Sequence, residues 1–417
     1  MPLSRLIHRV SSVGTADSTR LTGGCLTVSM AEARGVLADP ALAEVRLSWA
    51  SPGDSARIVK VLDAVEPRTK GPGGGGIFPG WLGPARVQGN GTTHVLRGVA
   101  VITAGHLPRA QEAIIDLRGP AAAMSPFGST HNLVIEFDAA PGASWESVDV
   151  ALRRGALRLA TWLADAALNV EPDEVEVLPS PSTGERSGGR PRVGAITNLQ
   201  TQGAFKDVFV YGRSFAGGLP TLLDPGEFDD GAVVSGQFGH PALKNPTFVH
   251  QNHPVIAALR RRHGQDLDFG GVVICPEPVD QSGKELIAAL AARICAAAGF
   301  DAAVVTKEGG GNADADVALK MDSLADAGIE AVGIYAEMAG TDGTGPSLVV
   351  APERATAMIS TGNYDHLLSL PQMERALGGN ELALVGAPAT SAIEVPTAVV
   401  YCSLSPLGWG HLTAAAT

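Results

Sequence analysis

Polar side chains cluster directly after four apolar segments in the second half of the chain, at the points where strands should end. The side chains in these loops that could carry chemistry are Gln200, Gln202, Glu308, Asn312, Glu337, Asp342 and Asn363. Carboxylates can hold a cationic amine or move a proton, and the glycines beside them let the backbone approach a small ligand. The alternative is ordinary turn and helix-cap chemistry, which uses the same residue types. Because four such loops recur, we predict a ligand site in which Glu308 and Glu337 are acid–base groups and the other five residues contact the substrate.

The densest polar segment of the chain contains His250, Asn252 and His253. The two histidines are three residues apart, a spacing that could ligate a metal on a helix. Pro254 biases His253 toward extended backbone, however, and no third ligand stands at a recognised spacing. We therefore expect no metal, and interpret His250 as a third acid–base group with Asn252 as a substrate contact; capping and turn contacts are the alternative. His94, at a predicted strand start, is either another substrate contact or a structural hydrogen-bond donor.

Motifs that would assign a reaction are not found in the sequence. There is no nucleophile elbow, no P-loop and no pair of histidines in the H-E-x-x-H pattern. The glycines at 309–311 do not form G-x-G-x-x-G, so a dinucleotide site is weakly indicated, although Glu330 lies near the usual spacing for a ribose contact. The residues alone indicate an enzyme-like protein with a small polar ligand and leave the reaction open.

The elements that must position these side chains alternate between strand and helix in the second half. The expected strands are 193–198, 208–211, 232–235, 269–275, 302–307, 331–337, 356–360, 382–385 and 398–402, and the expected helices are 254–262, 283–298 and 314–327. This alternation with continuous apolar strands predicts a doubly wound, mostly parallel sheet. Such sheets bind ligands beyond the carboxyl ends of their strands, which is where the four polar loops fall.

The first half is rich in glycine and strand signals. The expected strands are 20–29, 44–50, 57–65, 95–103, 113–117 and 132–137, with helices at 30–38 and 144–168. A polar segment follows at 179–192, which we interpret as a flexible linker. The predicted fold class is therefore α/β, with a mixed, strand-rich N-terminal region (1–178) and a C-terminal doubly wound domain (193–417).

Composition excludes several classes of partner. The chain has 417 residues, of which 45% are hydrophobic, and a net charge of -12, which disfavours binding to nucleic acid or anionic membrane surfaces. Charged residues interrupt any signal-like segment at the N-terminus, and no apolar stretch is long enough for a membrane helix. The four cysteines form no C-x-x-C pair, so neither a disulfide framework nor a cysteine zinc site is indicated. We expect a cytoplasmic homo-oligomer.

Ordered motifs across most of the chain resemble the component B alpha/beta proprotein of glycine, sarcosine and betaine reductases. They include IFPGWLGP (77–84), THVLRGVA (93–100), LQTQG (199–203) and KNPTFVHQN (244–252). The resemblance implies a small amine substrate, held as a Schiff base by a pyruvoyl group that forms when the proprotein cleaves itself before a cysteine. It also implies a partner subunit whose selenocysteine or cysteine cleaves the C–N bond reductively.

This sequence departs from the family at the cleavage position. Phe238 stands where the cysteine is expected, and no cysteine occurs between Cys25 and Cys275. Phenylalanine has no side-chain nucleophile for the acyl shift that starts the cleavage, so we expect no pyruvoyl cofactor. Ser235 could perform the shift in principle, because serine is the pyruvoyl source in other families.

Three functions are consistent with these observations. The first is reductive cleavage of a C–N or related bond in a small amine, without the pyruvoyl group and with a thiol- or selenol-bearing partner subunit. The second is a non-redox lyase or hydrolase of a small amide or amine, in which the acid–base groups at Glu308, Glu337 and His250 carry the reaction. The third is a subunit that binds a ligand without catalysis, since a fold does not imply a retained function.

Overall fold

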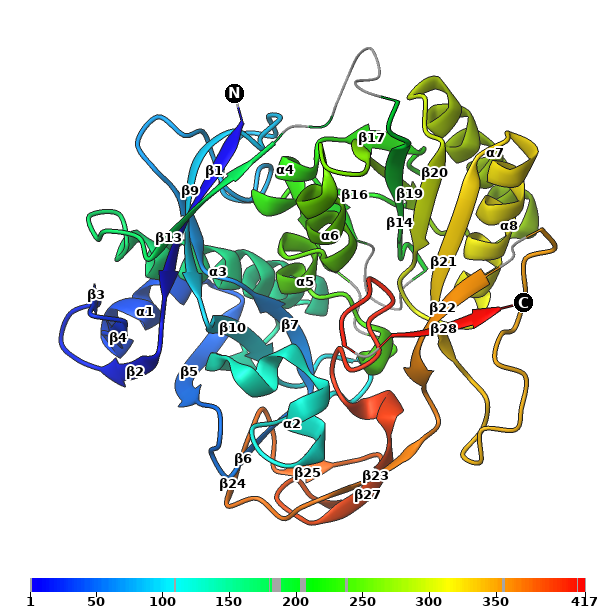
Figure 1. The fold of residues 1–417 in the computed structure, drawn as a ribbon. Helices are drawn as coiled ribbons and strands as arrows, with labels where there is room; N and C mark the ends of the chain where they lie inside the picture. Colours follow the sequence, from blue (N-terminus) through cyan, green and yellow to red (C-terminus); the bar gives the residue numbers. More distant parts are fainter. Residues whose placement is uncertain are drawn as a thin grey trace.

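The computed structural model places a strand-rich half of the chain beside a half in which one large sheet is flanked by helices (Figure 1). The structure describes residues 2–108, 110–179, 181, 189–202, 208–236, 239–354, 357–410 and 412–416. Within these residues the fold class is α/β, as the sequence predicts. Phe238 and most of the predicted linker at 179–192 lie outside the described residues.

The large sheet has seven strands. Their order is β17 (Thr221–Leu223), β19 (Asp268–Pro276), β14 (Arg192–Leu199), β20 (Ala302–Thr306), β21 (Glu330–Glu337), β22 (Ala357–Asn363) and β28 (Thr413–Ala416). The five inner strands are parallel, and the two edge strands run antiparallel to them. Numbered along the chain, the parallel strands follow the order 2-1-3-4-5. The winding therefore reverses between β14 and β20, which makes the gap between their carboxyl ends the topological switch point.

Helices cover both faces of this sheet. The helices α7 (Gln281–Ala297) and α8 (Asn312–Asp326) pack on one face, and α6 (Pro254–Arg262) packs on the other. Side chains of each strand alternate between the two layers: Val273 of β19 joins the cluster under α7 and α8, and Val272 joins the cluster under α6. Both faces are thus apolar, which explains why the inner strands read as continuous apolar runs.

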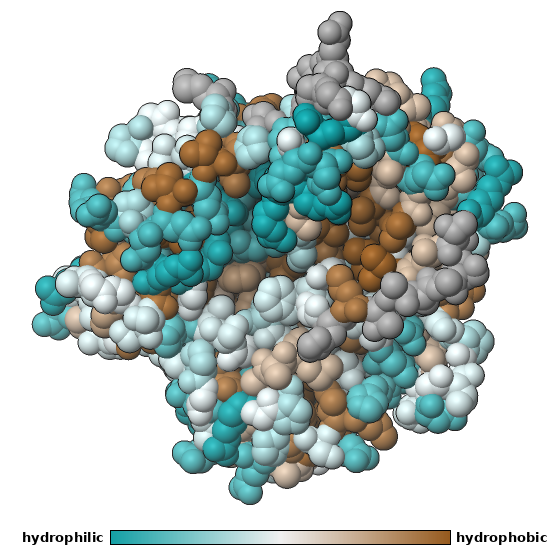
Figure 2. Space-filling view, viewed as in Figure 1, coloured by the Kyte–Doolittle hydropathy of each residue, from teal (hydrophilic) through white to brown (hydrophobic). Residues whose placement is uncertain are grey.

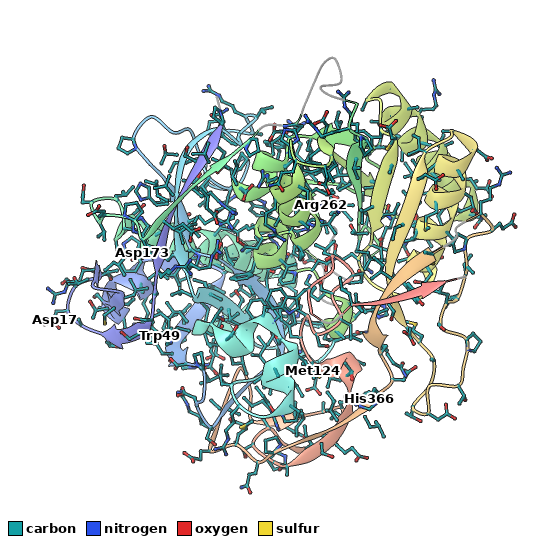
Figure 3. The ribbon with its side chains drawn as sticks, in the orientation of Figure 1. Asp17, Trp49, Met124, Asp173, Arg262 and His366 are labelled. Carbon is teal, nitrogen blue, oxygen red and sulfur yellow. The ribbon has the colours of Figure 1, made fainter. Side chains whose placement is uncertain are left out.

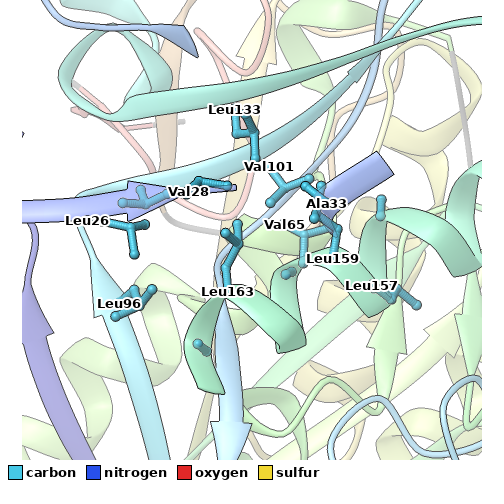
Figure 4. Close-up of a cluster of buried hydrophobic side chains, with 14 of the residues drawn as sticks. Leu26, Val28, Ala33, Val65, Leu96, Val101, Leu133, Leu157, Leu159 and Leu163 are labelled. Atoms are coloured by element: carbon cyan, nitrogen blue, oxygen red, sulfur yellow. The ribbon is translucent and has the colours of Figure 1, made fainter. Parts of the chain in front are cut away.

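Two four-stranded sheets form the body of the first half. Their orders are β13 (Glu174–Leu178), β1 (Leu3–Arg9), β9 (Gly91–Arg97), β8 (Arg68–Lys70) and β5 (Leu42–Ala50), β12 (His131–Ala139), β10 (Val99–Ala104), β7 (Val61–Val65). The helices α1 (Met30–Leu37) and α3 (Trp145–Asp165) close the core between these strands, with Leu159 and Leu163 of α3 at its centre (Figure 4). Ser144 caps α3 by accepting a hydrogen bond from the backbone of Ser147.

The predicted strand 20–29 is wrong, because a turn at Gly23 and Gly24 divides it into the antiparallel strands β3 (Arg20–Thr22) and β4 (Cys25–Val28). Two other predicted single strands are wrong, because each is broken by one residue with positive φ. The segment 57–65 is split at Lys60 (φ 53°), and the segment 95–103 is split at Gly98 (φ 96°). At Gly98 a Cβ atom would lie 2.8 Å from the backbone oxygen of Val10, so the break requires glycine. Apolar periodicity continues through both breaks and gave no sign of them.

The C-terminal segment 398–402, predicted as a strand, is also wrong. It forms the end of the 3₁₀-helix η3 (Thr397–Val399) and the turns after it. Its apolar side chains, including Val400 and Tyr401, are buried against the first half of the chain, so burial and not strand pairing explains their character. The predicted strand 382–385 shortens to β25 (Glu381–Leu382), and β28 was not predicted from its alanines.

The remaining elements are short. They are β2 (Ser12–Thr15), β3 (Arg20–Thr22), β4 (Cys25–Val28), β6 (Ala56–Val59), β11 (Ile114–Asp116), α2 (Pro120–Met124), η1 (Pro126–Ser129), β15 (Phe209–Val210), β16 (Arg213–Ser214), α4 (Pro225–Asp229), β18 (Val233–Val234), η2 (Pro241–Leu243), α5 (Thr247–Gln251), β23 (Leu367–Leu370), β24 (Arg375–Leu377), β26 (Ala387–Pro388) and β27 (Ile393–Pro396). The parallel pairing of β24 with β6 brings the end of the chain back to the first half. The division at 178 and 193 stays a prediction. Among the described residues, no helix has the length and apolarity that a membrane span requires.

Candidate active site

The four polar loops meet at one edge of the large sheet. Because β14, β20, β21 and β22 are mutually parallel neighbours, their carboxyl ends lie side by side, as the sequence predicts. Gln200 directly follows β14, and Glu308 lies two residues beyond β20. The backbone N–H of Gln200 donates to Oε2 of Glu308 at 3.2 Å. Glu308 therefore lies at the switch point, where doubly wound sheets bind their ligands.

The Glu308 carboxyl group is almost entirely buried, with 1% of the residue exposed. Its other oxygen, Oε1, has no hydrogen bond of ordinary geometry to any described residue. Burial raises the pKa of Glu308 to about 7, and Lys244 and the backbone groups of Gln200 and Asn245 act in the opposite direction. A carboxyl group with this pKa can accept and release a proton near neutral pH.

Lys244 is the principal cation beside Glu308. It follows η2, is 2% exposed, and donates from Nζ to Oγ of Ser235 at 2.6 Å. Burial lowers the pKa of Lys244, while the charges of Glu308 and Asp63 raise it. Neighbouring opposite charges in a buried place favour each other's charged forms.

Residues from the first half of the chain complete the cluster. Asp63 of β7 accepts from Thr247 through both carboxylate oxygens, at 3.0 Å from the backbone N–H and 2.7 Å from the hydroxyl. Thr247 in turn accepts from the backbone N–H of Ser235 at 3.0 Å, and Arg153 of α3 donates to the backbone oxygen of Ser235. Burial raises the pKa of Asp63, and Lys244 and Arg153 lower it. The centre therefore lies where the two halves meet.

A second buried layer of ion pairs lies on the α7 and α8 side of the same edge. Lys307 pairs with Asp314, and Lys284 pairs with Asp316, which also lies 3.6 Å from Lys320. All five side chains are at most 2% exposed. Removing one partner would leave an uncompensated buried charge, at a cost of about 3–5 kcal/mol. This layer fixes α8 and the loop that carries Glu308.

Two of the predicted substrate contacts lie beside the switch point. Nδ2 of Asn312, at the start of α8, donates to Oε1 of Gln202 at 3.0 Å, and Nε2 of Gln202 donates to the backbone oxygen of Pro278 at 2.7 Å. The first bond joins the loop after β14 to the loop after β20, and the second joins it to the loop after β19. Gln202 and Asn312 thus share the edge with Glu308, and their role as substrate contacts stays a prediction.

The loops after β21 and β22 hold the other candidates at this edge. Oε1 of Glu337 accepts from the hydroxyl of Ser360, and Nδ2 of Asn363 donates to the backbone oxygen of Gly340 at 2.8 Å. Asp342 is exposed and accepts two hydrogen bonds from Thr344 within its own turn. For Asp342 the structure favours the turn alternative, while Glu337 and Asn363 link neighbouring strand ends.

The side chains of three further candidates make no hydrogen bond to Glu308. His250 of α5 is fully buried, and neither of its ring nitrogens has a hydrogen-bond partner among the described residues. Asn252 accepts from Arg68 at 2.8 Å and donates to Glu66 at 3.0 Å. His94 belongs to β9, where Nδ1 lies 3.0 Å from Nε2 of His8. The structural alternative for His94 therefore fits its contacts.

Sequence reasoning missed Asp63, Arg153 and Lys244 as members of the centre. A signal existed for each of the first two: Asp63 is a charge inside an apolar strand, and Arg153 stands with Asp149 at i,i+4 on the buried side of α3. Such charges are rarely buried unless they are paired. The pairing partners lie in distant segments, so the spacing along the chain could not identify them.

The predicted absence of a pyruvoyl group stays a prediction, because Phe238, the expected cleavage position, lies outside the described residues. The four cysteines are free thiols in other segments. The backbone N–H of Ser235 donates to Thr247, its carbonyl accepts from Arg153, and its hydroxyl accepts from Lys244. Val234 before it pairs with Phe209 between two strands. Among the residues that the structure describes, no cluster of three or more histidine, cysteine, aspartate or glutamate side chains could hold a metal ion.

Fold and centre together define an α/β protein with a buried cluster of charged side chains at the switch point of a doubly wound sheet. The family model for glycine/sarcosine/betaine reductase component B subunits matches residues 1–415, so the chain belongs to this family. The resemblance seen in the sequence motifs is thereby confirmed.

Curated relatives match over most of their length. The chain is 35% identical over 416 residues to the glycine reductase complex component B subunits alpha and beta of Peptoclostridium acidaminophilum, with 97% of each chain covered. It is 34% identical over 373 residues to the sarcosine reductase complex component B subunit alpha of the same organism, covering 88% of this chain and 87% of the relative. The betaine reductase complex component B subunit alpha matches at 29% over 430 residues, with 97% of each chain covered. No solved structure matches the chain with significance.

Proposed function

We propose that this chain is the substrate-binding subunit of a reductase complex that cleaves a C–N or related heteroatom bond in a small amine. A thiol or selenol on a partner subunit supplies the nucleophile, and no pyruvoyl group takes part. The relatives support this proposal, because their names place them in glycine, sarcosine and betaine reductase complexes, whose named substrates are small amino compounds.

The observation that carries the proposal is the buried Glu308 carboxyl group, whose Oε1 has no hydrogen bond among the described residues and whose pKa burial raises to about 7. In the proposed step the sulfur or selenium of the partner forms a bond to carbon while the C–N bond breaks. The electron pair of that bond leaves with nitrogen, and Glu308 gives the nitrogen a proton. General acid catalysis of this kind contributes about 10²–10⁴ in rate when the pKa of the acid is near the working pH.

Lys244 and Asp63 are charged neighbours of Glu308 in this centre. Lys244 stabilises the carboxylate that remains after proton transfer, and the Asp63–Thr247 pair fixes the segment that carries Ser235. Preorganised charges in a water-poor site cost no reorganisation during the reaction. Glu337 and His250 stay candidates for further acid–base roles.

The test is a reconstituted assay of the chain with a cysteine- or selenocysteine-bearing reductase subunit and a dithiol reductant. Glycine, sarcosine, betaine and simple hydrazines serve as substrates, and release of ammonia or amine is measured. The proposal expects release that requires both the partner and the reductant.

The same assay separates the alternatives. Turnover by the isolated chain without reductant would instead assign a lyase or hydrolase, which the Glu308 centre could also serve. Saturable binding of an amine without turnover under any condition would assign a non-catalytic ligand-binding subunit. Either result contradicts the reductive proposal.

The absence of the pyruvoyl group has its own test, which is the intact mass of the purified chain. One mass, equal to that of the uncleaved 417-residue polypeptide, is expected. Two fragments with a blocked new N-terminus near Ser235 would show that the serine has replaced the family's cysteine, and would overturn this part of the proposal.

A further inference from the structure

A polar cavity lies between the two halves of the molecule, on the side of α5 that carries His250. Its volume is about 420 Å³, within the range of small-molecule sites. Its walls come from β1, β9, β13, α4, α5 and α6. Hydrophilic residues gather between β13 and α6 in the upper part of Figure 2. The charged or titratable side chains that line the cavity are Arg5, Arg97, Glu176, Asp229, His250, His253, Arg260 and Arg261.

The carboxylates of this cavity are already engaged. Asp229 accepts from Nη1 of Arg5 at 2.8 Å and also from Nη1 of Arg260. Glu176 accepts from Nε of Arg5 at 2.7 Å. Four arginines face two carboxylates here, so the wall carries an excess of positive charge.

The arginines, by contrast, retain unused donors. Arg97 donates from Nε to Glu66 at 3.0 Å, but its buried Nη2 has no partner among the described residues. The buried Nε of Arg260 is likewise without a partner in the described part of the chain. Leaving such charged donors unsatisfied in a buried place destabilises the protein. A ligand that accepts hydrogen bonds would remove this destabilisation.

His250 supplies an uncharged donor to the same cavity. The residue is 0% exposed, lines the cavity, and has both ring nitrogens unpaired within the described residues. Burial, together with the positive charge of Lys244 and the neighbouring His253, lowers its pKa well below 6.5. The ring is therefore neutral, with one N–H to donate and one nitrogen to accept.

We propose that this cavity is a binding site for a small oxyanion, a carboxylate or phosphate group that accepts hydrogen bonds from Arg97, Arg260 and His250, with Arg261 adding charge at the rim. A guanidinium group presents its N–H donors in a fork that matches carboxylate and phosphate oxygens. The lining residues of the cavity do not include Glu308, Lys244 or Asp63, so the site uses other side chains than the Glu308 centre. It does not depend on the proposed bond cleavage, because binding alone defines it.

The test is titration calorimetry of the full chain with malonate in one arm and inorganic phosphate in the other, at fixed ionic strength with chloride as counter-ion. Saturable binding of at least one probe is expected. The stronger arm distinguishes a carboxylate ligand from a phosphate ligand.

Adjacent arginines of α6 offer a matched pair of variants. Arg261 lines the cavity, whereas Arg262 is paired with Asp266 outside it and is exposed (Figure 3). Arg261→Gln should weaken binding by about tenfold, and Arg262→Gln, with the same change in charge, should leave it within about twofold. Arg97→Gln, checked for folding by circular dichroism, should weaken binding at least as much as Arg261→Gln.

Two results would overturn the inference. One is the lack of saturable binding for both anions. The other is equal weakening by Arg261→Gln and Arg262→Gln, which would assign the effect to general surface charge. Neither result depends on whether the chain turns over an amine.

Discussion

At the scale of single residues, the account depends on the unequal surroundings of the two oxygens of Glu308. Oε2 accepts from the backbone of Gln200, while Oε1 is buried without a hydrogen bond of ordinary geometry among the described residues. Native proteins leave few buried polar atoms unsatisfied, and such atoms call for an explanation. A ligand that donates a hydrogen bond to Oε1 would explain this atom, and so would protonation of the carboxyl group.

The raised pKa of Glu308 predicts a pH-dependent stability. The ordinary pKa is 4.5 and the folded value is about 7, so between these pH values the folded protein holds a proton that the unfolded chain has lost. The free energy of unfolding should therefore fall as pH rises through this window, by up to about 3 kcal/mol from this group alone. Glu308→Gln, which has no proton to lose, should lack this part of the fall.

The measurement is denaturant unfolding of both proteins at about pH 5 and about pH 8. Glu285→Gln, on the exposed face of α7, is the matched control and should follow the parent protein. Parallel pH dependences for Glu308→Gln and the parent would show that Glu308 titrates at an ordinary pKa.

Lys244 predicts a second effect on the same carboxyl group. Because its charge lowers the pKa of Glu308, Lys244→Met should shift that pKa upward from about 7. In the reconstituted assay, the pH at which the rate falls on the alkaline side should rise, since Glu308 must be protonated to act. An unchanged pH profile with a lower rate would mean that Lys244 acts only through Ser235.

At the scale of elements, the packing of β14 beside β19 depends on two glycines near the starts of these strands. A Cβ atom at Gly194 of β14 would lie 1.8 Å from the ring of Phe300, and one at Gly270 of β19 would lie 2.4 Å from it. Two neighbouring strands thus leave room for one aromatic ring. The sequence contained these glycines, but only the pairing of the strands shows that they share a neighbour.

This packing predicts opposite effects for two glycine substitutions. Gly194→Ala should lower the free energy of unfolding by about 1–3 kcal/mol, because the ring of Phe300 must move. Gly35→Ala, at an exposed position of α1 with no atom within 4 Å of the new Cβ, should raise it by about 0.5–1 kcal/mol. Thermal or denaturant unfolding measures both, and a neutral Gly194→Ala would contradict the packing described here.

At the scale of the whole molecule, local sequence patterns predicted those features of the fold that depend on residues close together in the chain. Strand and helix alternation gave the parallel sheet, and the sheet gave the shared edge of the four loops. The missing information was long-range. Thr247 bonds Asp63 across 184 positions, and no periodicity relates two residues so far apart. For the same reason Glu308 could be singled out from the sequence but its neighbours could not, and the contact of His94 with His8, 86 positions away, could not be foreseen.

The breaks at Lys60 and Gly98 illustrate a second limit. Apolar patterning reports which side chains are buried, and both segments are buried on each side of the break. A single left-handed residue changes the direction of the strand without changing that pattern. The prediction for 398–402 failed for a similar reason, since the segment is buried but forms only an isolated bridge, from Val400 to Ile114, among the described residues.

Release of amine in the reconstituted system, compared between the parent chain and Glu308→Gln, tests the central claim most directly. The account predicts that the parent releases amine only with the partner subunit and reductant, and that Glu308→Gln slows release by about 10²-fold or more while Glu285→Gln does not. Equal rates for the parent and Glu308→Gln, or release that needs neither partner nor reductant, would contradict it.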